Sequence, residues 1–326
     1  MKINIKVKTI VVFIWGCFLI NLNIDTAYSQ NPFITNMYTA DPAARVFNDT
    51  FYVYTSHDED TATWFSMVNW HVFSTIDMKN WVDHGVIFSL DDLPWATKYA
   101  WAPDCIHYNE KYYLYYPVDA NYIGVAISDK PYGKFKDPLG KPLVSRQTPG
   151  VVNNRDLIDP AIFIDDDSTP YLIFGQNDIN IIKLNKDMVS FNDSAKIIKG
   201  IDDFFEAVWM HKYKGKYYLS YSSKNGQIKY GIGNNPYGPF EMKGVILDYV
   251  NSGTNHASIT EYKGNWYLFY HNSDLYFKRN PHIEPVVNWK SVNPFRRSIC
   301  VDYLFYNEDG TIRQVIPSLK SVSGLK

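Results

Sequence analysis

Five segments of this chain repeat one pattern, in which an acidic, aromatic or histidine residue opens a short apolar run that ends in an aromatic cluster. Their first residues lie about 47 to 60 positions apart, which is the period of a propeller blade. Residues at matching places in repeated strands should lie at matching places in the fold, so the repeat brings distant side chains together. The segments are DPAARVFNDTFYVY from Asp41, WAPDCIHYNEKYYLYY from Trp101, DPAIFIDDDSTPYLIFG from Asp159, EAVWMHKYKGKYYLSYS from Glu206 and HASITEYKGNWYLFYH from His256.

Each segment predicts two strands joined by a hairpin, because Val, Ile, Tyr and Phe dominate and turn pairs such as Asn48-Asp49 and Lys214-Gly215 interrupt them. Four further segments lead from a strand through a polar turn to an aromatic residue: Trp81, Phe135, Phe191 or Phe240. We therefore predict an all-β fold, a five-bladed β-propeller with four-stranded antiparallel blades in a single domain. The fifth blade is expected to be completed by RRSICVDYLFYNEDGTIRQV, together with the residues just after Gln30.

The first 29 residues have the pattern of a secretory signal peptide. Three lysines in the first eight residues precede an apolar stretch, Thr9–Ile20, that is too short to span a membrane comfortably, and small residues precede Gln30. Lipidation at Cys17 is the alternative. No later segment is apolar enough to cross a membrane. We predict a signal peptide at 1–29, a propeller domain at 30–326, and a secreted or periplasmic location.

Composition excludes some classes of protein and favours others. Hydrophobic residues make up 46% and charged residues 20%, so a large core is possible. The net charge of −2, without a basic stripe, argues against a nucleic-acid partner. Aromatic residues reach 17%, which suits strands and surfaces that stack on sugars. Cys105 and Cys300 are expected to be buried thiols, although an oxidising compartment would allow them to pair.

The carboxylates among the five opening residues carry the chemistry. In a propeller the innermost strands converge on the axis, so Asp41, Asp159 and Glu206 should share one pocket. Their charges repel, which raises the pKa of at least one of them. Hydrolysis of a glycosidic bond needs one protonated and one ionised carboxyl group. Taken alone, each Asp-Pro could simply begin a turn; Glu206 is harder to explain, because it stands in the apolar run FFEAVWM.

An ordered set of motifs resembles glycoside hydrolase family 43, whose five-bladed propeller enzymes cleave arabinose and xylose units from plant polysaccharides. The resemblance runs from Asn31 to about Val315. Its pieces are TADPAARVF, WAPD, RDLIDPAIF, FFEAVWMHKYKGKYYLSYS, GTNHASI and FRRSICVDYL.

The resemblance assigns a role to each carboxylate. It implies that Asp41 is the general base that activates water and that Glu206 is the general acid. Asp159 would tune the pKa of the acid and hold it in place. Family members invert the anomeric centre, which fits a base acting through a water molecule.

The resemblance also implies residues that bind substrate or metal. His256 matches a histidine on the propeller axis that supports a calcium ion or a water-filled centre, although Ala257 replaces a second polar residue there. Arg296, or its neighbour Arg297, matches an arginine that contacts substrate hydroxyls. Trp101 would offer a ring face to the sugar.

Several alternatives stay open. One is a relative specific for galactose units, and another is a secreted glycan-binding propeller without catalysis. A fructan hydrolase is disfavoured, because Met37-Tyr38-Thr39-Ala40 replaces its usual opening. The sequence leaves the sugar, its linkage and the exo or endo mode open. We interpret Asp165-Asp166-Asp167 as a hairpin turn, not a calcium loop. We interpret His57-Asp58-Glu59-Asp60 as a solvated loop, and the alternative is that it lines the pocket rim.

Overall fold

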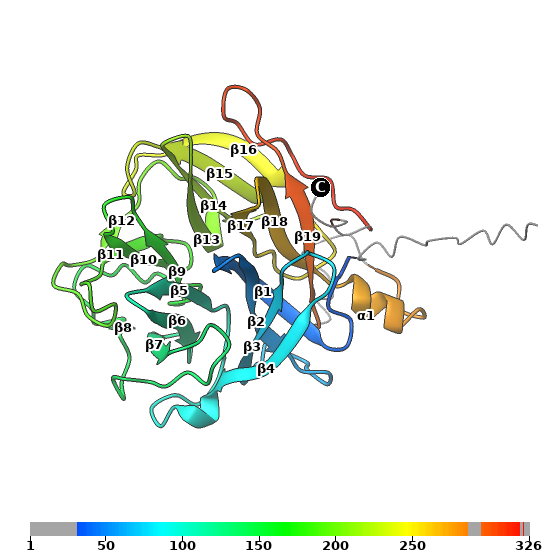
Figure 1. The fold of residues 1–326 in the computed structure, drawn as a ribbon, viewed down its shortest axis with the longest axis horizontal. Coiled ribbons are helices and arrows are strands. Elements are labelled where there is room, and N and C mark those ends of the chain that lie inside the picture. Colours follow the sequence, from blue (N-terminus) through cyan, green and yellow to red (C-terminus); the bar gives the residue numbers. More distant parts are fainter. Residues whose placement is uncertain (1–30, 286–294, 320–321, 323–326) are drawn as a thin grey trace, which may run out of the picture.

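The computed structural model describes residues 31–285, 295–319 and 322. Within them, five antiparallel sheets surround a central axis, and the first strand of each sheet lies innermost (Figure 1). This arrangement confirms the predicted five-bladed propeller. The predicted signal peptide lies outside the described residues, and so does Cys17.

The strands follow one another blade by blade along the chain. Blade one contains β1 (Tyr38–Phe47), β2 (Thr50–Asp58), β3 (Asn69–Thr75) and β4 (Val82–Ser89). Blade two contains β5 (Asp104–Tyr108), β6 (Lys111–Val118), β7 (Tyr122–Ser128) and β8 (Val144–Ser145). Blade three contains β9 (Ala161–Ile164), β10 (Pro170–Phe174), β11 (Asn180–Lys183) and β12 (Lys196–Ile197). Blade four contains β13 (Phe204–Tyr213), β14 (Lys216–Ser223), β15 (Ile228–Gly233) and β16 (Glu241–Leu247), and blade five contains β17 (Ser258–Tyr262), β18 (Asn265–Asn272) and β19 (Ser298–Leu304).

Helical structure is sparse. A short 3₁₀ helix, η1 (Leu90–Asp92), follows blade one, and α1 (Asp274–Arg279) lies between β18 and β19. In the part of the chain that the structure describes, neither helix has the length and apolar character needed to cross a bilayer.

The predicted hairpin turns join the first two strands of each blade. Asn48 and Asp49 have φ angles of 48° and 57°, and Lys214 and Gly215 have 46° and 73°. Positive φ at both central residues is the geometry of the tight turn that matches the twist of two antiparallel strands. The Asp165-Asp166-Asp167 segment likewise turns the chain between β9 and β10, as expected.

Among the residues that the structure describes, the fifth blade has three strands, where we predicted four. Its third strand, β19, comes from the expected C-terminal stretch and pairs with β18. The residues after Gln30 run along the outer edge of β19, where the Phe33 N–H donates to the Ile299 carbonyl at 3.3 Å and the Asn31 side-chain amide donates to the Val301 carbonyl at 3.0 Å. Pro32 has no N–H to offer, so this segment completes the blade by scattered hydrogen bonds and not by a strand ladder.

Buried tyrosines explain much of the aromatic content. The core lies between adjacent blades, where large aromatic side chains are fully buried. The hydroxyl of Tyr54 in blade one donates to the Pro131 carbonyl in blade two at 2.6 Å, and Tyr115 in blade two donates to Met188 in blade three at 2.7 Å. Each ring thus fills the space between blades while its hydroxyl is satisfied by the neighbouring blade.

The two cysteines of the propeller are both free and buried. Cys105 lies at the inner edge of blade two in β5, and Cys300 lies in β19 of blade five. The expectation of buried thiols is therefore confirmed, and the disulfide is not formed.

Candidate active site

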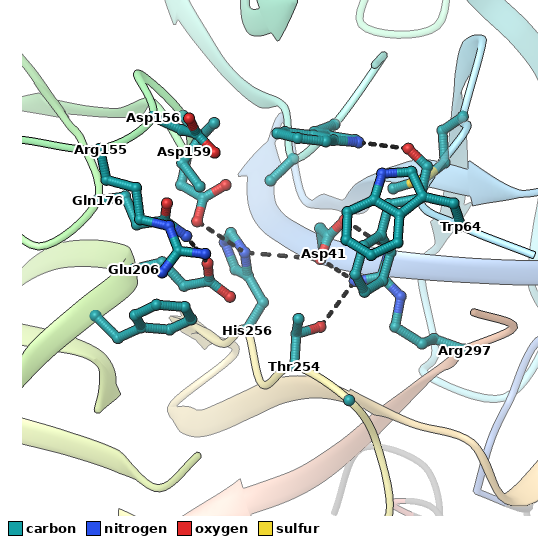
Figure 2. A pocket seen from close by; sticks show the side chains of 17 residues that line it. Asp41, Trp64, Arg155, Asp156, Asp159, Gln176, Glu206, Thr254, His256 and Arg297 are labelled. Carbon is teal, nitrogen blue, oxygen red and sulfur yellow. Dashed lines mark hydrogen bonds and ion pairs between the residues drawn. The ribbon is translucent and has the colours of Figure 1, made fainter. Parts of the chain in front are cut away.

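A pocket of about 230 Å³ opens where the innermost strands begin (Figure 2). It holds the opening residues of all five repeats, contributed by five different blades. Its lining residues are Asp41, Trp64, Phe65, Met67, Trp101, Ala102, Arg155, Asp156, Ile158, Asp159, Gln176, Phe205, Glu206, Gly253, Thr254, His256 and Arg297.

Irregular backbone turns the three acidic side chains into this pocket. The register of β1 against β2 shifts around Asp41, and the register of β13 against β14 shifts around Glu206. Asp41 and Asp159 both have φ of 55°, and Ala207, next to Glu206, has φ of 61°. Such bulges re-aim side chains and recur beside active sites. A left-handed residue other than glycine is uncommon, so this backbone is held by its surroundings.

Asp41 is kept ionised. Burial would raise its pKa, but the Arg297 guanidinium and the nearby histidines outweigh burial and lower the pKa of Asp41 to about 2. Arg297 donates to both carboxylate oxygens, from Nη1 at 2.8 Å and from Nη2 at 3.3 Å. Ser56 adds a hydroxyl donor at 2.6 Å. At neutral pH Asp41 is therefore a carboxylate.

Asp58 holds Arg297 from the other side. Its carboxylate accepts hydrogen bonds from Arg297 Nε at 2.9 Å, Nη2 at 2.8 Å and the backbone N–H at 2.7 Å. Asp58 is 1% exposed, so the expectation that it belongs to a solvated loop was wrong. A buried guanidinium needs carboxylate partners, and Asp58 and Asp41 supply them.

Glu206 has the opposite environment. Burial raises its pKa to about 7; the negative charge of Asp41 also raises it, while a hydrogen bond from Gln176 Nε2 at 2.7 Å favours the ionised form. Asp159 has a pKa well above its usual range, raised by burial and then by the charge of Glu206. Its Oδ2 accepts the Ala207 N–H at 2.8 Å, which supports the bulge that carries Glu206. The pair therefore retains a proton near neutral pH.

His256 stands between two of the carboxylates. Its Nδ1 lies 3.8 Å from Asp41 Oδ1 and 3.9 Å from Asp159 Oδ2. Burial, opposed by Asp41 and assisted by Arg297, lowers the pKa of His256 to about 4. The imidazole is therefore neutral and separates the carboxylates without adding charge.

Trp101 lines the pocket in a fixed orientation. Its indole Nε1–H donates to the Phe65 carbonyl at 2.8 Å, and its ring stacks on Tyr99 with centroids 4.6 Å apart. A wall of this kind offers a rigid apolar surface.

The structure distinguishes the two candidate arginines. Arg296 is outside the pocket: its Nη1 donates to the Asp60 carbonyl at 2.8 Å, and its guanidinium lies over the Tyr276 ring. Arg297 lines the pocket, and the sequence had offered it as one of two alternatives for an arginine that contacts substrate. Of the two alternatives, Arg297 and not Arg296 lines the pocket, because adjacent residues of an extended chain point to opposite sides.

Arg297 has little capacity left for a ligand. An arginine side chain carries five N–H donors. Those of Arg297 face Asp58 twice, Asp41 twice and the Thr254 hydroxyl at 3.0 Å. The exposed guanidinium of Arg155, which we did not predict, lies on the pocket wall over the Phe205 ring at 5.4 Å. Arg155 is therefore better placed than Arg297 to meet a ligand.

The polar residues that we missed share one location. Asp58 ends β2, Gln176 follows β10, and His271 lies near the end of β18. In an antiparallel hairpin the second strand ends at the edge where the first strand begins. Polar residues at the ends of the second strands could therefore have been predicted from the same repeat.

The donor set around His256 does not fit a calcium ion held by protein ligands. Calcium takes about six to eight oxygen ligands. Among residues 31–285, 295–319 and 322, no group of three His, Cys, Asp or Glu side chains is arranged to hold a metal ion. Asp41 already serves Arg297, and Asp159 already serves the Ala207 N–H. We derive no chemical step through a metal.

A propeller whose axis holds a charge-paired carboxylate opposite a protonated carboxyl pair defines a class: hydrolases that cleave glycosidic bonds with two acids. Family comparison agrees, because the model of glycosyl hydrolases family 43 matches residues 29–312. The chain belongs to this family.

Individual relatives cover nearly the whole chain. Xylosidase/arabinosidase 43A of Humicola insolens is 36% identical, over 86% of this chain and 98% of the relative. The solved structure of an α-L-arabinofuranosidase from Clostridium thermocellum is 44% identical with a TM-score of 0.74, covering 90% of this chain and 97% of that one. A β-xylosidase/α-arabinofuranosidase from a compost microbial metagenome, solved with xylotriose in a calcium-free form, is 36% identical with a TM-score of 0.75, covering 88% and 97%.

Proposed function

We propose that this protein is an inverting glycoside hydrolase that releases arabinose or xylose units from plant-type polysaccharides or oligosaccharides. One observation carries the proposal. In a single pocket, the pKa of Asp41 is lowered to about 2 while that of Glu206 is raised to about 7. Groups whose pKa values are pushed apart in this way serve as base and acid in the same reaction.

The proposed reaction is a single displacement. The ionised Asp41 takes a proton from a water molecule as that water attacks the anomeric carbon. The protonated Glu206 donates to the leaving oxygen, so the reaction does not depend on a good leaving group. Asp159 and Glu206 repel each other when both are ionised, so the pair retains a proton, and the Asp159 carboxyl group fixes the bulge beside Glu206. The neutral imidazole of His256 lies between Asp41 and Asp159.

The pocket walls support a small sugar substrate. Trp101 provides a rigid face on which a sugar ring can stack, and Arg155 offers guanidinium donors near Glu206. The names of the relatives, xylosidase/arabinosidase and α-L-arabinofuranosidase, support arabinose and xylose as the sugars.

We further propose that the enzyme acts outside the cytoplasm, because residues 1–29 have the pattern of a signal peptide. Sequencing the N-terminus of the protein recovered from its native host tests this idea. A mature chain starting close to Gln30 supports export. A modified Cys17 at the N-terminus would support a lipid anchor, and an uncleaved Met1 would contradict both.

The decisive experiment is turnover of nitrophenyl α-L-arabinofuranoside, β-D-xyloside and galactosides, followed by arabinoxylan oligosaccharides. NMR of the first-formed product should show inversion at the anomeric carbon. Hydrolysis of the galactosides alone would favour the galactose-specific alternative. Binding of oligosaccharides without any turnover would replace the enzyme by a glycan-binding propeller.

A further inference from the structure

The backbone of the base residue needs support that its own strand does not provide. Asp41 has φ of 55° and has no partner in the register of β1 against β2. A bulge leaves the extra residue without a ladder hydrogen bond, and a buried N–H without an acceptor is costly. The Asp41 N–H finds its acceptor in a side chain from another blade, His271 Nδ1, at 3.1 Å.

The second ring nitrogen of His271 determines which tautomer is present. His271 is 0% exposed in β18, and its Nε2 lies 3.0 Å from the Thr254 carbonyl oxygen and 3.2 Å from its hydroxyl. A carbonyl oxygen can only accept, so Nε2 carries the hydrogen and Nδ1 presents its lone pair to Asp41. Burial, assisted by the charge of Arg297, lowers the pKa of His271 to about 3, which keeps the ring neutral.

These contacts close a ring of hydrogen bonds around the base. Thr254 Oγ1 accepts from Arg297 Nη1 at 3.0 Å, and the same nitrogen donates to Asp41 Oδ1 at 2.8 Å. His271 joins the Asp41 backbone to Thr254, so the main chain and the carboxylate of Asp41 are fixed by one network. We propose that His271 is a positioning residue for the general base, holding the Asp41 backbone through the Nδ1 lone pair.

The proposal rests on the function proposed above and adds a residue to it. The base must place a water molecule in line with the anomeric carbon, and a misplacement of about 1 Å can lower the rate about a hundredfold. Loss of the Nδ1 acceptor frees the bulged backbone and lets the carboxylate move. Because His271 is fully buried behind Asp41, its loss should lower kcat and leave KM nearly unchanged.

Two substitutions separate the two ring nitrogens. In His271→Asn the amide oxygen can occupy the place of Nδ1, whereas in His271→Gln the amide occupies the place of Nε2. We expect His271→Gln to lose about a hundredfold in kcat, on good and poor leaving groups alike, and His271→Asn to recover at least a tenth of wild-type kcat. The matched control is the same pair of changes at His211, another buried neutral histidine, whose Nε2 contacts the Tyr306 hydroxyl away from the pocket. Both control variants should keep wild-type kcat.

Several results would overturn the proposal. Equal losses in the two His271 variants, a change confined to KM, or a loss that disappears when activity is corrected for folded protein would each reduce His271 to a structural residue. Long-range ¹H–¹⁵N NMR of the wild-type ring gives a test that needs no variant. A hydrogen on Nδ1 at pH 6 contradicts the proposal, whereas a hydrogen on Nε2 alone supports it. If wild type turns over no glycoside, the proposed function fails, and the NMR result still decides the hydrogen bond to Asp41.

Discussion

The two sides of the pocket hold the same chemical group in opposite states. Asp41 and Glu206 are 5% and 8% exposed, so burial acts on both. Asp41 faces Arg297 and the Ser56 hydroxyl, and its pKa falls. The pKa of Glu206 rises, because burial, together with the charge of Asp41, outweighs the hydrogen bond from Gln176. The comparison teaches that the charge of the neighbour, and not the depth of burial, decides which acid gives a proton and which accepts one.

The two sides also support their bulges differently. On the Asp41 side, the strained backbone N–H donates to a neutral imidazole, His271. On the Glu206 side, the N–H of Ala207 donates to the carboxyl group of Asp159. The imidazole adds no negative charge beside the base, whereas the acid shares a retained proton with the carboxyl group of Asp159. Four substitutions test this contrast.

Asp41→Asn should have the largest effect. It removes the base, and we expect kcat to fall by about 10⁴-fold for activated and natural leaving groups alike. Initial rates on dinitrophenyl and nitrophenyl glycosides measure this loss. Asp49→Asn, a change of the same type in the β1–β2 turn, is the control and should be active. Substantial turnover by Asp41→Asn would remove this residue from the base role.

Glu206→Gln should discriminate between leaving groups. An oligosaccharide needs protonation as it leaves, so kcat should fall by about 10³-fold, whereas a dinitrophenyl glycoside should lose less than about tenfold. Glu261→Gln, in the exposed part of β17, is the matched control. Equal losses on both substrates would assign the acid role to another residue.

Asp159→Asn should shift the pH profile. Activity requires ionised Asp41 and protonated Glu206, so kcat/KM falls as the pH drops through the pKa of Asp41, about 2, and as it rises through that of Glu206, about 7. Asp159 and Glu206 repel each other when both are ionised, so an amide at position 159 should lower the pKa of Glu206 and move the basic limb to lower pH. The accompanying loss at neutral pH should be about 10- to 100-fold. An unchanged basic limb would show that Asp159 does not tune the acid.

Gln176→Leu should give the smallest effect, in the opposite direction. In the wild type the hydrogen bond from Gln176 stabilises ionised Glu206 and lowers its pKa. Removing it raises the pKa of Glu206, so the basic limb should move to higher pH. Below pH 6 the change in kcat should stay within about threefold, because the acid is already protonated. Gln147→Leu, at an exposed loop outside the pocket, controls for the loss of an amide. A basic limb that moves to lower pH would reverse the assigned role of this contact.

The repeat predicted those site residues that stand at the same position in each repeated segment. The starts of the first strands could be aligned from sequence, and Asp41, Asp159, Glu206, Trp101 and His256 all line the pocket. Asp58 and His271 were not predicted as site residues, because neither opens a repeated segment and no local pattern marks them. Their roles appear only when the second strand of a blade is followed back to the axis, where Asp58 meets Arg297 from the last blade.

The choice between Arg296 and Arg297 shows a physical limit of sequence reasoning. Both residues precede β19, and both are cations in the same motif. The side to which each points depends on how β19 registers against β18, a contact between residues about 30 positions apart that no local pattern specifies. The sequence also did not predict that the fifth blade has three strands. The only local signal was Pro32, which cannot donate a ladder hydrogen bond from the segment beside β19.

The positions of Asp41 and Arg297 in the chain have a consequence for how the active site forms during folding. Asp41 belongs to the first strand of the propeller, and its counter-ion Arg297 stands immediately before the last, β19. Until β19 docks, Asp41 lacks the guanidinium of Arg297, which lowers its pKa in the folded protein. The active site is therefore complete only when β19 has paired with β18 and closed the propeller. Detachment of β19 alone would separate Arg297 from Asp41 and abolish activity while the other blades stay folded.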